Sequence, residues 1–180
     1  MSHDTAFENA LHMRWSTPRG QAARQQALEA LRARRRALLR GALEPLRRRG
    51  VPTDRLDLRG IDLSREDLRG VDLSRVDLEG ADLRGADLGG AVLSGSCLRG
   101  ARLRAARLNA TNLEGADLRG ADLVGADLTL AELAGASLDG ADLEGAQLDG
   151  VAWGASAAED DRWTRTPPPP PAPPRGPAAR

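Results

Sequence analysis

Apolar residues recur at every fifth position over more than half of this chain of 180 residues. Leucine holds that place nineteen times without a gap from Leu58 to Leu148, and Trp153 takes the next place. A small apolar residue stands two places before most of these leucines, and Asp usually stands one place before. Neither the 3.6-residue period of a helix nor the two-residue period of a strand fits this spacing. The pattern therefore predicts a repeat architecture built from five-residue units.

Within each unit the sequence predicts which side chains point inward. Residues two apart, such as Ala81 and Leu83, point to the same side of an extended segment, and Asp82 points to the other. Gly fills the fifth place in fourteen of twenty units, and its tolerance of a positive φ suits a tight corner. We expect the leucine position to form the core, as represented by Leu83, Leu103, Leu123 and Trp153.

The stretch from Leu56 to Ala155 resembles the pentapeptide-repeat proteins, whose motif is written A(D/N)LXX. The cleanest copies read Ala81-Asp82-Leu83-Arg84-Gly85 and Ala121-Asp122-Leu123-Val124-Gly125. The resemblance implies an all-β solenoid, a right-handed quadrilateral parallel β-helix with four units in each coil. Residues 56–155 would then form about five coils, and a strand spacing of about 4.8 Å gives a rod of roughly 24 Å.

Residues 1–55 form a different, Arg-rich segment that we expect to be mostly helical and to cap the array. Thr17-Pro18 is a suitable helix start, and apolar residues follow at helical spacing as far as Leu43. Arg24, Arg32 and Arg35 interrupt this apolar stripe. A solenoid end exposes strand edges and core leucines, so it needs a cover.

Glu66 places a carboxylate at an inward position of the array, where an arginine of the N-terminal segment would neutralise it. Large inward residues near the start of the array also suit packing against a helix; they are Leu56, Ile61, Val71 and Val76.

Residues 156–180 are predicted to be a disordered proline-rich tail. Its Pro170–Arg175 stretch fits the P-x-x-P-x-R pattern of SH3 ligands, although proline-rich tails match that pattern easily by chance. Trp153, with or without Trp163, would plug the far end of the array. The protein would then be a monomer. Alternatively, it forms a dimer through this end, as some relatives do.

Charge is balanced over the whole chain, with 26 basic and 26 acidic residues and no lysine. Its distribution is uneven: residues 1–55 hold twelve arginines against five acidic residues, and residues 56–180 hold fourteen against twenty-one. Only four residues are aromatic, which is too few for an ordinary globular core and typical of a solenoid filled by leucines.

No catalytic, cofactor or metal site is indicated. Both histidines, His3 and His12, lie outside the array, and no residue spacing suggests a nucleophile with its base. Cys97 stands where Asp usually does and is interpreted as a tolerated surface substitution. We expect a non-enzymatic protein, and the absence of an apolar run of signal or membrane length makes a cytoplasmic location the expectation.

Outward residues twenty apart should stack in columns, which makes them candidates for an interaction surface. One column holds Asp62, Asp82, Arg102, Asp122 and Asp142, and the next holds Asp67, Asp87, Arg107, Asp127 and Gln147. The arginines either relieve repulsion between the aspartates or form a patch for an anionic partner. That patch would consist of Arg99, Arg102, Arg104 and Arg107.

The favoured function is a rigid scaffold that binds a protein through its outward residues. The resemblance offers an alternative, because certain relatives mimic DNA, bind DNA gyrase or topoisomerase and protect it from inhibitors. When the charges of the outward residues are summed for each of the four sides, the net charges are only −2, −1, −2 and −2. These values argue against a continuous acidic stripe on any side. In a second alternative, the Arg-rich helix contacts nucleic acid or an anionic membrane.

Overall fold

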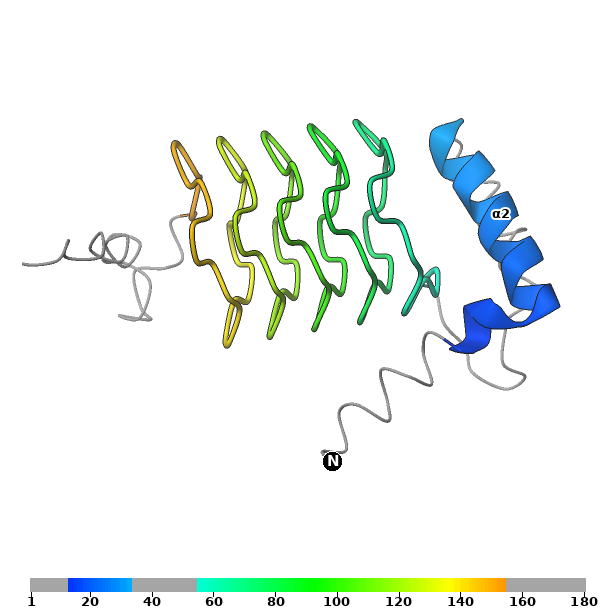
Figure 1. Ribbon diagram of the computed structural model, residues 1–180. Coiled ribbons are helices and arrows are strands. Elements are labelled where there is room, and N and C mark those ends of the chain that lie inside the picture. The colour runs from blue at the N-terminus through cyan, green and yellow to red at the C-terminus, as the bar shows by residue number, and fades with distance from the viewer. Residues whose placement is uncertain (1–12, 34–54, 155–180) are drawn as a thin grey trace, which may run out of the picture.

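A helix and a stack of coils make up the described part of the protein, which comprises residues 13–33 and 55–154 of a computed structural model. The helix, α2 (Pro18–Arg32), lies against the coil formed by the first residues of the array, and the last described coil lies at the opposite end of the stack (Figure 1). The predictions for Arg35, Leu38 to Leu43, Trp163 and the proline-rich tail concern residues outside these ranges.

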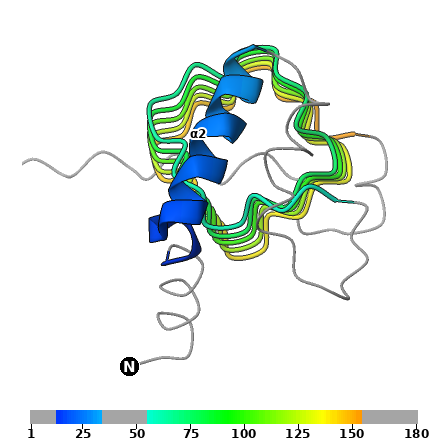
Figure 2. The same ribbon diagram turned by 90° about the vertical axis from the view of Figure 1, so that its right-hand side faces the viewer.

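Parallel bridges between residues twenty apart build the stack. Asp57 pairs with Asp77, Asp77 with Cys97, and Cys97 with Asp117. The Leu58 N–H donates to the Asp77 carbonyl at 2.8 Å, and the Asp77 N–H donates to the Leu56 carbonyl at 2.9 Å. Four five-residue units therefore complete one coil, and successive coils superimpose when viewed along the axis (Figure 2). The predicted twenty-residue stacking is confirmed.

Each unit contributes an isolated bridge residue rather than an extended strand. The reason is geometric, since a corner in every five residues leaves only a short extended piece between successive bends. The described array is therefore a solenoid of bridges and turns, with less strand than the expected all-β class suggests.

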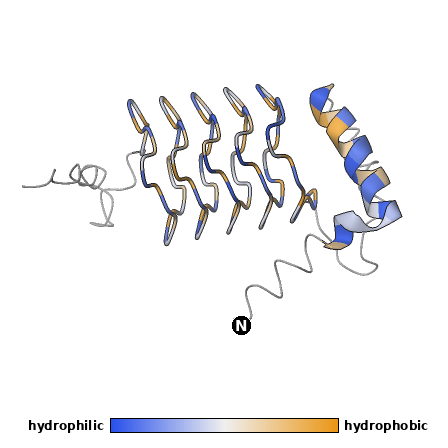
Figure 3. Ribbon diagram, viewed as in Figure 1, coloured by the Kyte–Doolittle hydropathy of each residue, from blue (hydrophilic) through white to orange (hydrophobic). Residues whose placement is uncertain are grey.

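The core is a ladder of leucines and small residues inside the coils. The side chains of Leu83, Leu103 and Leu123 are 0 % exposed. Hydrophobic and hydrophilic residues alternate along each coil (Figure 3), and the leucines among them are buried. Trp153 packs against this core but is only partly buried, because it lies in the last described coil.

The corners explain the frequent glycine. Fourteen corner glycines have positive φ, and Gly125 is representative at 65°. Non-glycine residues that occupy a corner adopt the same left-handed backbone, and they are Arg65, Arg75, Ala105, Ala110 and Leu130. The repeat therefore imposes the corner conformation even where the residue disfavours it.

Helix α2 begins as predicted and packs through small residues. The Thr17 side chain accepts the Gly20 N–H at 3.0 Å, and Pro18 occupies the first turn. A Cβ on Gly20 would lie 2.0 Å from the Arg14 carbonyl oxygen, so the helix start requires glycine there. The buried face joins the core of the array and contains Ala23, Ala27, Leu28, Ala30 and Leu31.

Candidate interaction surface

The outward Asp of each unit holds its own turn together. One Asp122 carboxylate oxygen accepts the Val124 N–H at 3.3 Å, and Asp142 accepts the Glu144 N–H at 3.1 Å. Asn112 makes the same bond to the Glu114 N–H at 3.0 Å. This turn, in which a short polar side chain binds the backbone two residues on, explains the choice of Asp or Asn. The sequence pattern predicts these aspartates only as outward surface charges and does not reveal their role in the turn.

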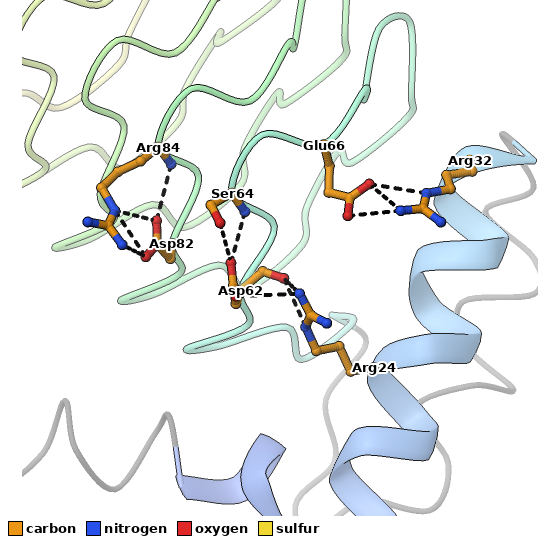
Figure 4. A network of polar contacts seen from close by, with 7 residues as sticks. All are labelled: Arg24, Arg32, Asp62, Ser64, Glu66, Asp82 and Arg84. Atoms are coloured by element: carbon orange, nitrogen blue, oxygen red, sulfur yellow. Dashed lines mark hydrogen bonds and ion pairs between the residues drawn. The ribbon is translucent and has the colours of Figure 1, made fainter.

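Four aspartates also receive an arginine from their own unit. Arg84 donates to both Asp82 oxygens, with its closest nitrogen at 2.5 Å (Figure 4), and Arg119 lies 2.6 Å from Asp117. The other two pairs are Asp57 with Arg59 and Asp67 with Arg69. These arginines fold back on the adjacent acid, so much of the surface neutralises itself.

The pairing changes the acidity of the aspartates. Burial alone would raise the pKa of Asp82, but the bonds from the Arg84 side chain and backbone outweigh it and lower the pKa. The pKa of Asp117 is lowered chiefly by the Arg119 hydrogen bond, and that of Asp127 by the bond from Thr129. All three carboxylates are therefore ionised at neutral pH.

The two predicted outward columns are present, but the predicted arginine patch is divided. Bridges place Arg102 between Asp82 and Asp122, and Arg107 between Asp87 and Asp127. Arg99 belongs to a third column, two residues after Cys97. The four arginines therefore lie on three successive sides of one coil.

Three of these arginines also face acidic residues of neighbouring coils. Arg104 lies 3.2 Å from Asp122, Arg107 lies 3.8 Å from Asp87, and Arg99 lies 3.9 Å from Glu79. These distances agree with the interpretation that the arginines relieve repulsion between stacked acidic residues. The arginines do not form one patch for an anionic partner.

Charge is strongly uneven along the axis of the stack. Residues 55–107 contain ten arginines and nine acidic residues, a net charge of +1. Residues 108–154, here called the distal half, contain nine acidic residues and one arginine, Arg119, a net charge of −8. The net charge of each of the four sides does not reveal this difference, because each side runs the whole length of the stack, although the difference is present in the sequence.

The acidic residues of the distal half occupy all four sides of the coils. Glu114 and Glu132 lie on one side, Asp127 and Asp149 on the next, and Asp117 and Asp139 on a third. The fourth side carries Asp122, Asp142 and Glu144. Within residues 13–33 and 55–154, no ion pair engages Glu132, Asp139, Asp142, Glu144 or Asp149.

The arginines of the helical segment contact the array. Arg32 donates to both Glu66 oxygens at 2.8–3.1 Å, which confirms the predicted neutralisation of that inward carboxylate (Figure 4). Arg24 donates twice to the Asp62 carbonyl, at 2.7 and 3.0 Å. The arginines that interrupt the apolar stripe of α2 therefore bind the edge of the first coil.

The segment before α2 adds a second anchor to the same coil. The Trp15 ring N–H donates to the Arg59 carbonyl at 2.8 Å, and Arg14 lies 2.8 Å from Asp57. Arg14 and Arg32 are therefore in ion pairs, which leaves them less suited to bind nucleic acid or membrane. The other arginines of that second alternative, from Arg34 to Arg49, lie outside the described residues.

Catalytic or metal chemistry has no visible centre in the described part of the chain. Cys97 is half-buried, and burial raises the pKa of its thiol, so the unreactive protonated form dominates at neutral pH. Across residues 13–33 and 55–154, no three His, Cys, Asp or Glu side chains are grouped to hold a metal ion. No described helix combines the length and apolar character required to span a membrane.

The chain was compared with solved structures and with family profiles. Solved structures that resemble the chain include a pentapeptide-repeat protein of the Arabidopsis thaliana thylakoid lumen, with 37 % identity over 52 % of this chain and 68 % of that one (TM-score 0.43). Rfr23 of the cyanobacterium Cyanothece 51142 shares 33 % identity over 53 % and 82 % (TM-score 0.37). QnrB1, a plasmid-mediated fluoroquinolone resistance protein, shares 21 % over 53 % and 61 % (TM-score 0.26).

The chain was also compared with curated proteins and with family profiles. No curated protein matches the chain significantly. The profile described as "Pentapeptide repeats (8 copies)" matches residues 54–90, 86–125, 96–133 and 121–151, which together span more than half of the chain. With the twenty-residue bridges and the leucine core, this match shows that the chain belongs to the pentapeptide-repeat family.

Proposed function

We propose that the protein is a non-enzymatic scaffold that binds a protein partner through the outward residues of its array. In this proposal the array is a right-handed quadrilateral β-helix of about five coils, and α2 caps its first coil. The leucines fill the interior of the described coils, where Leu83 and Leu103 have no exposed surface, so that interior has no room for a small substrate. The outward side chains remain as the surface for recognition, and the expected cytoplasmic location stays a prediction.

The observation that carries this proposal is the acidic distal half, with its net charge of −8. Charged patches steer association with surfaces of opposite sign. The proposed partner therefore presents a basic surface, and the distal half is its docking region. The first half of the array, near neutral and internally paired, contributes little to this attraction.

A matched pair of triple variants tests the docking region. Asp122→Asn, Asp127→Asn and Asp142→Asn remove three charges while keeping the turn bond, because Asn112 makes that bond naturally. The control carries Asp62→Asn, Asp67→Asn and Asp87→Asn in the first half. A photo-crosslinking amino acid at Val124, introduced into the protein in its own cells, should give a specific adduct that only the distal triple variant loses. Equal loss in both variants would refute the docking region.

The second candidate function is mimicry of the DNA that gyrase binds, and one observation favours it. Residues 108–154 rise about 11 Å along the axis, so their net charge amounts to about one per 1.4 Å, close to the value of about one per 1.7 Å in duplex DNA. A DNA gyrase supercoiling assay with the full chain tests it. Inhibition that the distal triple variant abolishes supports mimicry, and no inhibition at micromolar protein removes this candidate.

A further inference from the structure

Leu130 is a leucine outside the core, at a corner of the distal half. It is 62 % exposed, whereas Leu103 and Leu123 have no exposed surface. Its φ of 60° lies in the left-handed region, which leucine disfavours and which glycine occupies at most corners. Neither burial nor backbone preference therefore explains a leucine at this position.

The Leu130 side chain lies across the corner of the next coil. The Leu130 N–H donates to the Asp149 carbonyl at 2.8 Å, which stacks Leu130 on the corner residue Gly150. A Cβ on Gly150 would lie 2.7 Å from Leu130 Cδ2. The glycine thus leaves room for the leucine, which is held against the stack and presents its other side to solvent.

Exposed apolar residues continue along the same edge of the stack. One occurs in each of four successive coils, and together they are called the apolar edge: Val92, Ala110, Leu130 and Ala152. Bridges connect Val92 through Asn112 and Glu132 to Ala152, so the first and last members share one column. The Ala110 N–H donates to the carbonyl of Thr129 at 2.8 Å, which places Ala110 and Leu130 in the adjoining corner column.

Carboxylates lie on both sides of the coil that meet at this edge. Asp127 and Asp149 belong to the side before the corner, and Glu114 and Glu132 belong to the side after it. Glu132 and Asp149 are exposed, and within residues 13–33 and 55–154 no ion pair engages them. Arg119, the one arginine of the distal half, belongs to another side of the coil. The apolar edge is therefore bordered by negative charge.

We propose that the apolar edge docks a segment of the protein partner in which an apolar side chain lies between Lys or Arg residues, with Leu130 as the anchor. This inference rests on the proposed function and adds the chemistry of the segment that is bound. The partner's apolar side chain covers Leu130, and its basic residues approach Asp149 on one side and Glu132 on the other. An apolar centre with a polar rim is the common arrangement of a protein interface.

Two arginine-rich peptides that differ at one position test this pairing. One carries leucine between its arginines and the other carries alanine there, and fluorescence anisotropy gives their affinities for the full chain. The leucine peptide should bind about ten times more tightly to the wild type, because only leucine covers enough apolar surface. Leu130→Gly should abolish most of this preference. Equal affinities for the wild type, or a preference that survives Leu130→Gly, would overturn the proposal.

The melting temperature separates docking from a structural role of Leu130. Leu130→Gly restores the residue that most corners use and relieves the left-handed strain, so the melting temperature should not fall. Ala105→Gly is the matched control, because it relieves the same strain at a different corner and should keep the preference for the leucine peptide. A fall in melting temperature for Leu130→Gly would overturn the proposal, since the leucine would then serve the fold.

The distal triple variant distinguishes this inference from the proposed function. Its three lost charges should weaken both peptides alike, because the charge attraction does not depend on the apolar position. If the triple variant binds both peptides as tightly as the wild type, or if neither peptide binds the wild type, the acidic docking region itself is refuted. If the triple variant weakens both peptides and Leu130→Gly leaves the leucine preference intact, only the role of the apolar edge is refuted.

Discussion

Each position of the five-residue unit has one physical task. Leucine and the small residue two places before it fill the interior, Asp binds the backbone of its own turn, and the fifth residue bends the chain with a positive φ. The side chain after leucine faces outward, and it contributes to the fold where an Arg, Ser or Thr there binds the Asp of its own unit. Variation in binding surface is therefore concentrated at this outward position.

A central leucine should be far more important to stability than its outward neighbour. Leu103→Ala opens a cavity inside the stack, and we expect it to lower the free energy of unfolding by about 2–5 kcal/mol. Arg104→Ala removes only the exposed pair with Asp122 and should change it by less than about 1 kcal/mol. Urea unfolding followed by circular dichroism measures both. Similar losses for the two variants would contradict the leucine core.

A corner position should respond to substitution through backbone strain alone. Gly125 has a φ of 65°, and a Cβ there would meet no atom within 4 Å. Gly125→Ala should therefore destabilise the protein by about 1 kcal/mol without any clash. The reverse change at another corner, Ala105→Gly, should shift the urea midpoint in the opposite direction. A shift of the same sign for both variants would exclude this explanation.

At the scale of elements, polar contacts attach α2 and the residues before it to the first coil at three places, and the middle one is the pair of bonds from Arg24 to the Asp62 carbonyl. Trp15 and Arg14 bind the first coil before the helix begins, and Arg32 binds Glu66 at its last turn. Small buried residues between these points, including Ala23 and Ala27, let the helix approach the coil closely. The contacts and the packed face together fix the direction of the helix across the end of the array.

Removing one partner of the Arg32–Glu66 pair should cost more than removing both. Arg32→Met leaves a carboxylate that is 17 % exposed without its cation, with an expected loss of about 1–3 kcal/mol. Glu66→Ile, which restores the apolar type found at Ile61 and Val71, should recover that loss in the double variant. Thermal unfolding of the two single variants and the double variant checks this. A double variant as unstable as Arg32→Met would disprove it.

The sequence predicted the parts of this arrangement that depend on periodicity. The core leucines and the helix start at Thr17 follow from spacing and residue type, whereas the stacking of residues twenty apart was implied by the resemblance to the pentapeptide-repeat proteins. The turn bonds of Asp and the arginines folded back on their own units depend on backbone geometry, which spacing does not reveal. The sequence predicted that an arginine would bind Glu66, because an inward carboxylate needs a cation. It did not predict which arginine would do so.

Over the whole molecule, the ion pairs and hydrogen bonds of the aspartates make stability depend on pH. The folded chain lowers the pKa of Asp82, Asp117 and Asp127. An unfolded Asp has a pKa of about 3.9, so this stabilisation is complete above that value and is lost as the pH falls through the lower, folded pKa. The melting temperature should therefore decrease below about pH 4.

Arg119→Met provides the matched comparison for this pH dependence. The Arg119 hydrogen bond is the main cause of the lowered pKa of Asp117, so the variant should lose less stability on acidification than the wild type. The melting temperature of each protein is measured at neutral and at acidic pH. Because acid changes the charge repulsion elsewhere in the distal half of both proteins alike, the difference between their losses reports on Asp117. A larger acid loss in the variant would contradict the assignment.

Charge along the axis is the property of the whole molecule that bears most directly on function. The first half of the array is near neutral and internally paired, while the distal half carries a net charge of −8 on all four sides. The most direct test is photo-crosslinking from Val124 in the full chain, compared between the wild type and the two triple Asp→Asn variants. We predict an adduct with a protein that presents a basic surface, lost in the distal variant and kept in the control. An adduct that survives the distal triple substitution, which reduces the net charge of that half from −8 to −5, would contradict the account.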